Sequence, residues 1–132
     1  MKEIVSAVVE SSAVDYRHDI ETSGHRLVCD EPPRNGGTGS GPGPYELVLS
    51  GLGGCTAITL RMYAKRKGWD LGHLRVELHL LMDREGRTEI TRALSSSAAL
   101  SDEQWERLLF IAEKTPVTLT LKAGADIRTH RA

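Results

Sequence analysis

The sequence predicts one α+β domain over residues 1–132, with the element order βββ-α-ββ-α-β. Two groups of strand-like segments, in which apolar and polar residues alternate, are separated by one long helix-like segment. Strands that follow one another, instead of alternating with helices, indicate antiparallel pairing. A length of 132 residues is typical of one domain with one hydrophobic core. We therefore expect an antiparallel sheet around a long, buried central helix.

Three short strands are predicted at the start of the chain. Residues 3–9 and 14–20 alternate around the polar turn Glu10-Ser11-Ser12, and residues 25–29 form the third strand. Residues 30–44 then read DEPPRNGGTGSGPGP, a composition in which no regular element is expected. Because this segment joins a small meander to a helix that could not fold separately, we interpret it as a loop inside one domain.

The central helix is predicted over residues 45–67, between Pro44 and Gly68. Up to Leu60 its residues are apolar or small on every side, which indicates burial, and the following turns are basic. Three glycines interrupt this helix, and each costs about 1 kcal/mol relative to alanine. We expect them to permit close approach of another backbone, or to leave room beside Cys55 for a substrate. These glycines are Gly51, Gly53 and Gly54.

A hairpin and a second helix are predicted next. Residues 74–82 and 88–99 alternate on either side of the turn at residues 83–86. The second helix begins after the N-cap Ser101, because Gln104 stands three residues later and completes a capping box.

The end of the chain is predicted to return to the sheet. Pro116 ends the second helix near Lys114. Residues 117–121 are compatible with a short turn or strand, and residues 125–129 with a last edge strand.

Charge and hydropathy narrow the possible functions. The 17 Lys and Arg residues against 18 Asp and Glu give a formal net charge of −1, so no general attraction to nucleic acid or to an anionic membrane is expected. The basic residues between 61 and 67 fit the last turns of a helix, where they complement its dipole.

The chain begins without a signal-like apolar run, and the uncharged stretch 47–60 is too short to cross a bilayer. We expect a cytoplasmic protein.

Neither the glycine-rich loop nor the histidines indicate a bound cofactor. No Gly-Lys-Ser/Thr follows the glycines of residues 36–43, as a phosphate-binding loop would require. The five histidines show no spacing typical of metal ligands. We therefore expect neither a metal nor another cofactor.

Cys55 is the candidate functional residue of the central helix. A free thiol is only about 3% thiolate at pH 7, so a reactive one needs a nearby cation or a helix N-terminus. Cys55 lies about ten residues into the predicted helix, too far for the dipole to help much. An arginine from another element would have to supply the charge. The alternative is a structural cysteine that packs as a small hydrophobe.

Several segments together resemble the OsmC/Ohr family of osmotically inducible and organic hydroperoxide resistance proteins. They include the segments 30–32 (DEP), 41–47 (GPGPYEL), 52–57 (LGGCTA), 60–64 (LRMYA) and 111–117 (IAEKTPV). The resemblance implies an intertwined homodimer in which two central helices pack together, with two active sites at the dimer interface.

The resemblance also implies a redox cycle with two cysteines. In the family's peroxidases, a first cysteine attacks the O–O bond of a hydroperoxide and becomes a sulfenic acid. A second cysteine, in a Cys-Pro-Val segment, then forms a disulfide that a dithiol reduces. Cys55 matches the first cysteine. Thr115 stands at the position of the second one, and a threonine hydroxyl cannot form a disulfide. Cys29, in the third predicted strand, is not at that position.

Two further site residues follow from the resemblance. The family has a carboxylate that holds the catalytic arginine, and Glu46 lies one residue after its ungapped position, which is Tyr45. Glu46 is therefore a candidate, with complementation of the helix dipole as the alternative. Arg17 or Arg26 could supply the cation that activates the thiolate, and we prefer Arg17.

Two functions remain open at this point. The first is an OsmC-like one-cysteine hydroperoxide reductase that acts on a small hydrophobic or peroxide substrate through Cys55. An external thiol or dithiol would reduce it, in an oxidative stress response. The alternative is a non-catalytic OsmC-like protein that binds a small molecule in a pocket at the dimer interface. We expect neither nucleic acid nor a membrane as a partner.

Overall fold

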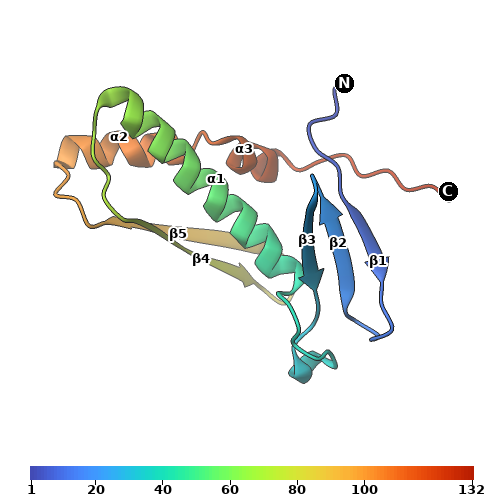
Figure 1. The fold of residues 1–132 in the computed structure, drawn as a ribbon. Coiled ribbons are helices and arrows are strands. Elements are labelled where there is room, and N and C mark those ends of the chain that lie inside the picture. The colour runs from blue at the N-terminus through green and yellow to red at the C-terminus, as the bar shows by residue number, and fades with distance from the viewer. The chain divides into compact units, whose positions relative to one another are not determined.

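The computed structural model describes residues 1–132 and separates them into two compact units, residues 1–48 and 49–132. The positions of the chain's parts relative to one another are not determined, so each unit is described by itself (Figure 1). In chain order the elements are β1 (Val8–Ser11), β2 (His18–Thr22), β3 (His25–Cys29), the 3₁₀ helix η1 (Pro33–Asn35), α1 (Pro44–Lys67), β4 (Leu74–Met82), β5 (Thr88–Ser96), α2 (Asp102–Ala112) and α3 (Pro116–Ala123).

The first unit contains the predicted antiparallel meander, with the strand order β1-β2-β3. The third strand is confirmed at residues 25–29, but the ranges 3–9 and 14–20 predicted for the first two strands are wrong. The Ser12 hydroxyl donates to the carbonyl oxygens of Val14, at 3.0 Å, and Arg17, at 2.7 Å. Because these bonds turn the chain after Ser11, β1 includes Glu10 and Ser11 of the predicted turn and β2 starts only at His18.

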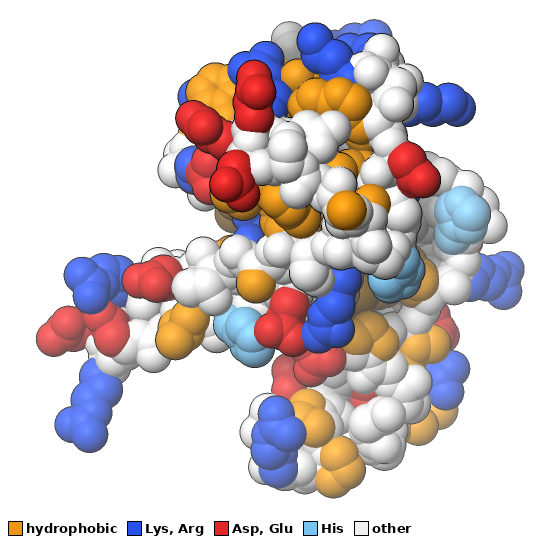
Figure 2. Space-filling view, turned by 90° about the vertical axis from the view of Figure 1, so that its left-hand side faces the viewer, with side chains coloured by type: hydrophobic (Ala, Val, Ile, Leu, Met, Phe, Trp, Pro, Cys, Tyr) orange, Lys and Arg blue, Asp and Glu red, His pale blue; other side chains and the backbone are white.

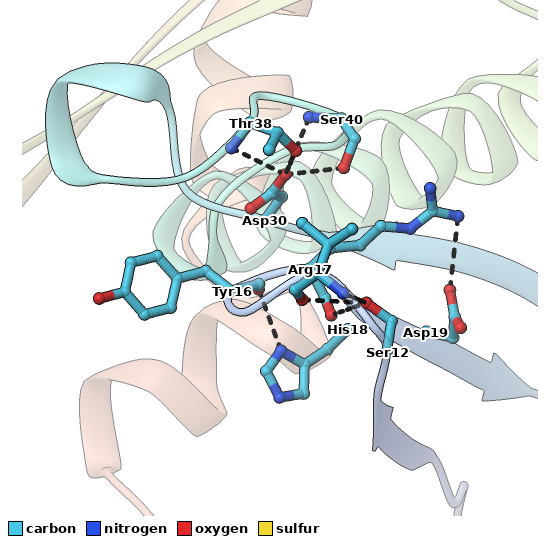
Figure 3. A network of polar contacts seen from close by, with 9 residues as sticks. Ser12, Tyr16, Arg17, His18, Asp19, Asp30, Thr38 and Ser40 are labelled. Atoms are coloured by element: carbon cyan, nitrogen blue, oxygen red, sulfur yellow. Dashed lines mark hydrogen bonds and ion pairs between the residues drawn. The ribbon is translucent and has the colours of Figure 1, made fainter.

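The glycine-rich loop is held by one buried carboxylate. The Asp30 side chain is 1% exposed and accepts bonds from the Thr38 and Ser40 hydroxyls at 2.6 and 2.7 Å (Figure 3). It also accepts from the backbone N–H groups of Thr38, Ser40 and Glu31. The Thr38 hydroxyl, followed by Ser40, holds the pKa of Asp30 well below its usual range.

Tight packing in this loop also requires a glycine. A Cβ atom at Gly37 would lie 1.9 Å from the Glu31 carbonyl oxygen, so no other residue fits there. The segment is thus an ordered loop with one 3₁₀ turn, where the sequence predicted no regular element.

In the second unit, α1 lies over the β4–β5 hairpin (Figure 1). The hairpin is confirmed with the register Leu74↔Ser96 to Met82↔Thr88, but β5 ends at Ser96 and not at residue 99. The Ser96 hydroxyl donates to the Leu71 carbonyl oxygen and accepts from the Ala98 N–H. Because these bonds turn the chain toward α2, the strand cannot continue.

Helix α1 buries one stripe and leaves its other faces open in the single chain. The buried residues are Leu52, Thr56, Leu60 and Ala64, one per turn. Ile58 and Met62 are 62% and 53% exposed, so the prediction of burial on every side is wrong for one chain. A two-stranded hairpin is too narrow to cover more than one face. Figure 2 shows such exposed hydrophobic side chains as orange patches among charged ones.

By length and apolar composition alone, α1 would also pass as a membrane-spanning helix, a test that core helices of soluble proteins pass too.

Only one of the three glycines of α1 is required by a close contact within the chain. A Cβ atom at Gly53 would lie 2.8 Å from Leu78 Cδ1, whereas Gly51 and Gly54 have open space.

The hydrophobic core of the second unit joins α1 to α2. Leu60, Ala64, Leu71 and Leu108 form it, and Trp105 packs against it. The predicted start of α2 is confirmed, since Ser101 and Gln104 form both bonds of a capping box.

The second helix ends before Pro116, as predicted, but the predicted return of the chain to the sheet is wrong. Residues 117–121 lie in helix α3, and residues 125–129 form no strand, so the observed order is βββ-α-ββ-α-α. Thr115 is the N-cap of α3 and Pro116 occupies its first turn. A proline that ends one helix is also favourable at the start of the next one, because its missing N–H is not needed there.

Candidate functional site

Cys55 lies at the edge of the buried stripe of α1. Its thiol is free and half-buried, between the exposed Gly54 and the fully buried Thr56. Helical spacing places Ile58 and Met62 on the same face of the helix as Cys55. Both side chains are apolar and more than half exposed. The thiol thus opens beside an apolar surface of α1.

A nearly buried guanidinium contacts the residue next to Cys55. Arg92, on β5, has a side chain that is 12% exposed. Its Nη1 donates to Thr56 Oγ1 at 2.9 Å and to Thr118 Oγ1 at 2.8 Å. The Thr56 hydroxyl in turn donates to the Leu52 carbonyl oxygen at 2.7 Å. One nitrogen atom therefore joins α1, β5 and α3.

Thr115 belongs to the same network. Its side chain is fully buried, and its Oγ1 lies 2.6 Å from Thr118 Oγ1. The hydroxyl of Thr115, the residue that the sequence analysis matched to the second cysteine, is thus already hydrogen-bonded and, through Thr118, linked to Arg92.

Glu113 supplies the negative charge nearest to this network. Its Oε1 lies 3.6 Å from Arg92 Nη2, and its other oxygen accepts a bond from Lys122. The Lys122 ammonium, followed by Arg92, holds the pKa of the Glu113 carboxyl below its usual value. Because Glu113 is 56% exposed and shared with Lys122, it neutralises Arg92 only in part.

Arg92 was not predicted as a site residue, although the sequence holds a signal for it. In β5 the inward positions alternate, and Arg92 stands between Ile90 and Leu94 on the half-buried side of the strand. A charged residue at an apolar position of an alternating strand indicates a buried polar network.

The other sequence-predicted residues lie in the first unit. Arg17 is 41% exposed, and its Nη2 lies 3.7 Å from Asp19 Oδ1 (Figure 3). Its Nε is buried without a hydrogen-bond partner. Arg17 and Arg26 both line one groove of about 510 Å³ on the meander. The preference for Arg17 as activator stays a prediction.

Glu46 and Cys29 also remain predictions. Glu46 is exposed in the first turn of α1, and a Cβ atom at Gly43 would lie 3.7 Å from its Oε1. That position suits a carboxylate at a helix N-terminus. Cys29 is half-buried and pairs with His18 in the meander register.

One groove of the second unit lies away from Cys55. It measures about 920 Å³ and is lined by Tyr63 and Trp69 together with residues of α2. Arg107 Nε donates to the Tyr63 hydroxyl there at 2.9 Å. No cluster of three His, Cys, Asp or Glu residues could hold a metal ion.

A comparison with protein families decides the affiliation. The family model described as OsmC-like protein matches residues 37–130, more than two thirds of the chain. The chain belongs to the OsmC-like family. Its sequence-based identification is thereby confirmed, and no curated protein matches the chain.

Solved structures of OsmC-like and related proteins share the fold. A protein from Psychrobacter arcticus 273-4, described as an osmotic stress induced and detoxification response protein, superposes with a TM-score of 0.79 at 20% identity, over 91% of this chain and 90% of that one. The organic hydroperoxide resistance protein OhrB of Bacillus subtilis gives 0.63 at 17% identity, over 94% of both chains.

A third structure is described as an organic hydroperoxide resistance protein from Vibrio cholerae, with captopril bound in one of its active sites. Its TM-score is 0.66 at 22% identity, over 92% of this chain and 86% of that one. These likenesses confirm the α+β fold with antiparallel sheets and a long helix.

Proposed function

We propose that this OsmC-like protein is a one-cysteine hydroperoxide reductase that uses the Cys55 thiol. The proposal rests on the contrast between two residues of the second unit, Cys55 and Thr115. Cys55 is a free, half-buried thiol beside exposed apolar side chains, whereas Thr115, aligned with the second cysteine, is buried and hydrogen-bonded.

The first step is oxidation of Cys55 by the hydroperoxide. The Cys55 thiolate attacks the outer peroxide oxygen, an S–O bond forms, and the O–O bond breaks. The alcohol leaves after it takes up a proton, and Cys55 becomes a sulfenic acid. In the homodimer proposed below, the apolar side chains of Ile58 and Met62 would line a pocket beside the thiol and favour a substrate with an organic group over hydrogen peroxide.

Reduction then requires an external thiol or dithiol. A first thiol attacks the Cys55 sulfur, an S–S bond forms, and water leaves. A second thiol attacks the mixed disulfide, so that Cys55 returns to the thiol and the reductant leaves as a disulfide. Thr115 takes no part in either exchange, because a hydroxyl cannot form the S–S bond.

The proposal is tested by single-turnover oxidation of the reduced protein with cumene hydroperoxide and with hydrogen peroxide. A sulfenic-acid reagent traps the product at Cys55. We expect stoichiometric sulfenic acid, formed faster with cumene hydroperoxide. Oxidation no faster than that of a free thiol with both peroxides would reject the reductase.

We also propose that the chain forms a homodimer through the open faces of α1. The single chain leaves Ile58 and Met62 exposed, and a Cβ atom at Gly51 or Gly54 would meet nothing within 4 Å. If a second helix lies against this face, Gly54→Ala weakens the dimer, and light scattering shows dissociation at a higher protein concentration. If the face is open, the substitution stabilises the helix by about 1 kcal/mol instead.

The second candidate is a non-catalytic protein that binds a small apolar molecule at the same face. It is favoured by one observation, that Cys55 lines neither of the two grooves described above. In this case a pocket at Cys55 forms only between two chains. Slow oxidation of Cys55 together with saturable binding of an apolar ligand by the dimer would support it.

A further inference from the structure

We infer that Arg92 is a positioning residue for Cys55, and that it fixes the turn of α1 that carries the thiol. The inference deepens the proposed function and rests on it. It concerns a residue of the hairpin, whereas the arginines suggested by the sequence lie in the first unit.

One pair of opposite residues in the β4–β5 hairpin contacts the turn of α1 that carries Cys55 at two points. Leu78 and Arg92 are direct partners in the register. Leu78 Cδ1 occupies the space that a Cβ atom at Gly53 would need, at 2.8 Å. Arg92 Nη1 donates to Thr56 Oγ1 at 2.9 Å. Cys55 lies between these two contacts, so the turn that carries it can neither rotate nor slide without breaking one of them.

The same guanidinium holds the segment between α2 and α3. Its Nη1 donates to Thr118 Oγ1 at 2.8 Å, and that hydroxyl lies 2.6 Å from Thr115 Oγ1. The position of the absent second cysteine is therefore tied to the turn of Cys55.

The charge of Arg92 argues for a role beyond packing. An ion that is 12% exposed has lost most of its hydration, and its only carboxylate partner is shared with Lys122. Replacement of a buried ion pair by apolar residues of similar volume often causes no loss of stability. A cation is justified if its Nη1 must hold the hydroxyl groups of Thr56 and Thr118 at fixed positions, and Thr56 follows Cys55 directly in α1.

The test compares oxidation rates of Cys55 by cumene hydroperoxide in single turnover. Arg92→Met keeps an unbranched side chain of similar volume but removes all its donors, and we expect the rate to fall about tenfold. Arg92→Lys restores one cationic donor group, and we expect a rate within about threefold of the wild type. A purely structural arginine would lower the melting temperature in Arg92→Met and leave the rate of the folded protein unchanged.

A matched control uses another arginine of the same unit. Arg61 of α1 donates from Nη2 to the Gly72 carbonyl oxygen at 2.8 Å, and thus also ties the helix to the sheet region without touching Thr56. We expect Arg61→Met to keep the oxidation rate within about twofold of the wild type.

A second variant covers the case in which Arg92→Met does not fold. Thr56→Val keeps the shape of the side chain and removes the acceptor, and we expect a rate about threefold below the wild type. In a folded Arg92→Met background, Thr56→Val should then have no further effect, because the two residues act through one contact.

The outcomes separate the two proposals. Slow oxidation of the wild type rejects the reductase, and the role of Arg92 falls with it. Fast oxidation of both the wild type and the Arg92→Met or Thr56→Val variants rejects the positioning role alone. Fast oxidation of the wild type, with slow oxidation of the variants and partial recovery in Arg92→Lys, supports both.

Discussion

Each unit of this OsmC-like chain buries one ion among threonine or serine hydroxyls, but the two arrangements differ in reach. Asp30 takes all its donors from residues 31–40, so its network closes one loop on itself. Arg92 joins Thr56, 36 residues earlier, to Thr118, 26 residues later. The local network shapes a loop, whereas the long-range network holds the elements around Cys55. We propose that the first network stabilises its loop, whereas the second also positions the thiol of Cys55.

The largest expected effect separates the two cysteines. Cys55→Ser should abolish peroxide consumption, because the hydroxyl is a much poorer nucleophile than the thiolate. Cys29→Ser, in the meander of the first unit, should leave it nearly intact. Steady-state peroxide consumption with an external thiol measures both variants. Equal losses would instead make Cys29 a resolving thiol and break the assignment of function to the second unit.

The next effect concerns the stability that Asp30 provides. Asp30→Asn replaces an acceptor of five hydrogen bonds by a group with one acceptor oxygen and one donor nitrogen. Donors of Thr38 and Ser40 are left unpaired, and we expect the melting temperature to fall by about 5 °C or more. Calorimetry of both proteins measures this, and an unchanged melting temperature would contradict the account of the loop.

The stability that Asp30 provides should also depend on pH. The pKa of Asp30 is lower in the folded protein than its ordinary value of about 3.9. A lowered folded-state pKa stabilises the protein fully above the unfolded-state value, and this stabilisation is lost as the pH falls toward the folded-state value. The difference between wild type and Asp30→Asn should therefore be constant above about pH 5 and shrink below about pH 4. Urea titrations across this range measure the difference in the free energy of unfolding between the two proteins. A difference that grows at low pH would contradict the prediction.

The smallest effect is expected from one hydroxyl of the long-range network. Thr118→Val removes the link between Arg92 and Thr115 but leaves the bond to Thr56 in place. We expect a loss of about 1 to 2 kcal/mol in the free energy of unfolding. Urea unfolding measures it, with the Arg61→Met variant as a reference for loss of an exposed bond. A neutral substitution would show that the network carries no stability.

The sequence predicted well those elements whose signals are local. Strand periodicity located β4, and the Ser101 capping box placed the start of α2, because both depend on neighbouring residues only. The start of β2 was missed, since the Ser12 side chain turns the chain in a way that periodicity does not reveal. A strand was predicted at residues 125–129 from its composition, but strand formation also requires a partner strand.

The candidate site was predictable only in part, for a related reason. Cys55 and the replacement at Thr115 are visible in the sequence through the family motif. Arg92 is not, because its partners come from elements that only the fold brings together. Its inward position in β5 was a weak signal, since one charged residue in a strand is most often solvent-exposed.

The most direct test of the central claim is the intact mass of the reduced protein after one equivalent of cumene hydroperoxide, without added thiol. The one-cysteine account predicts a gain of one oxygen atom, located at Cys55 by peptide mapping. A loss of two hydrogen atoms, with a peptide that links Cys55 to Cys29 or to a second chain, would contradict it.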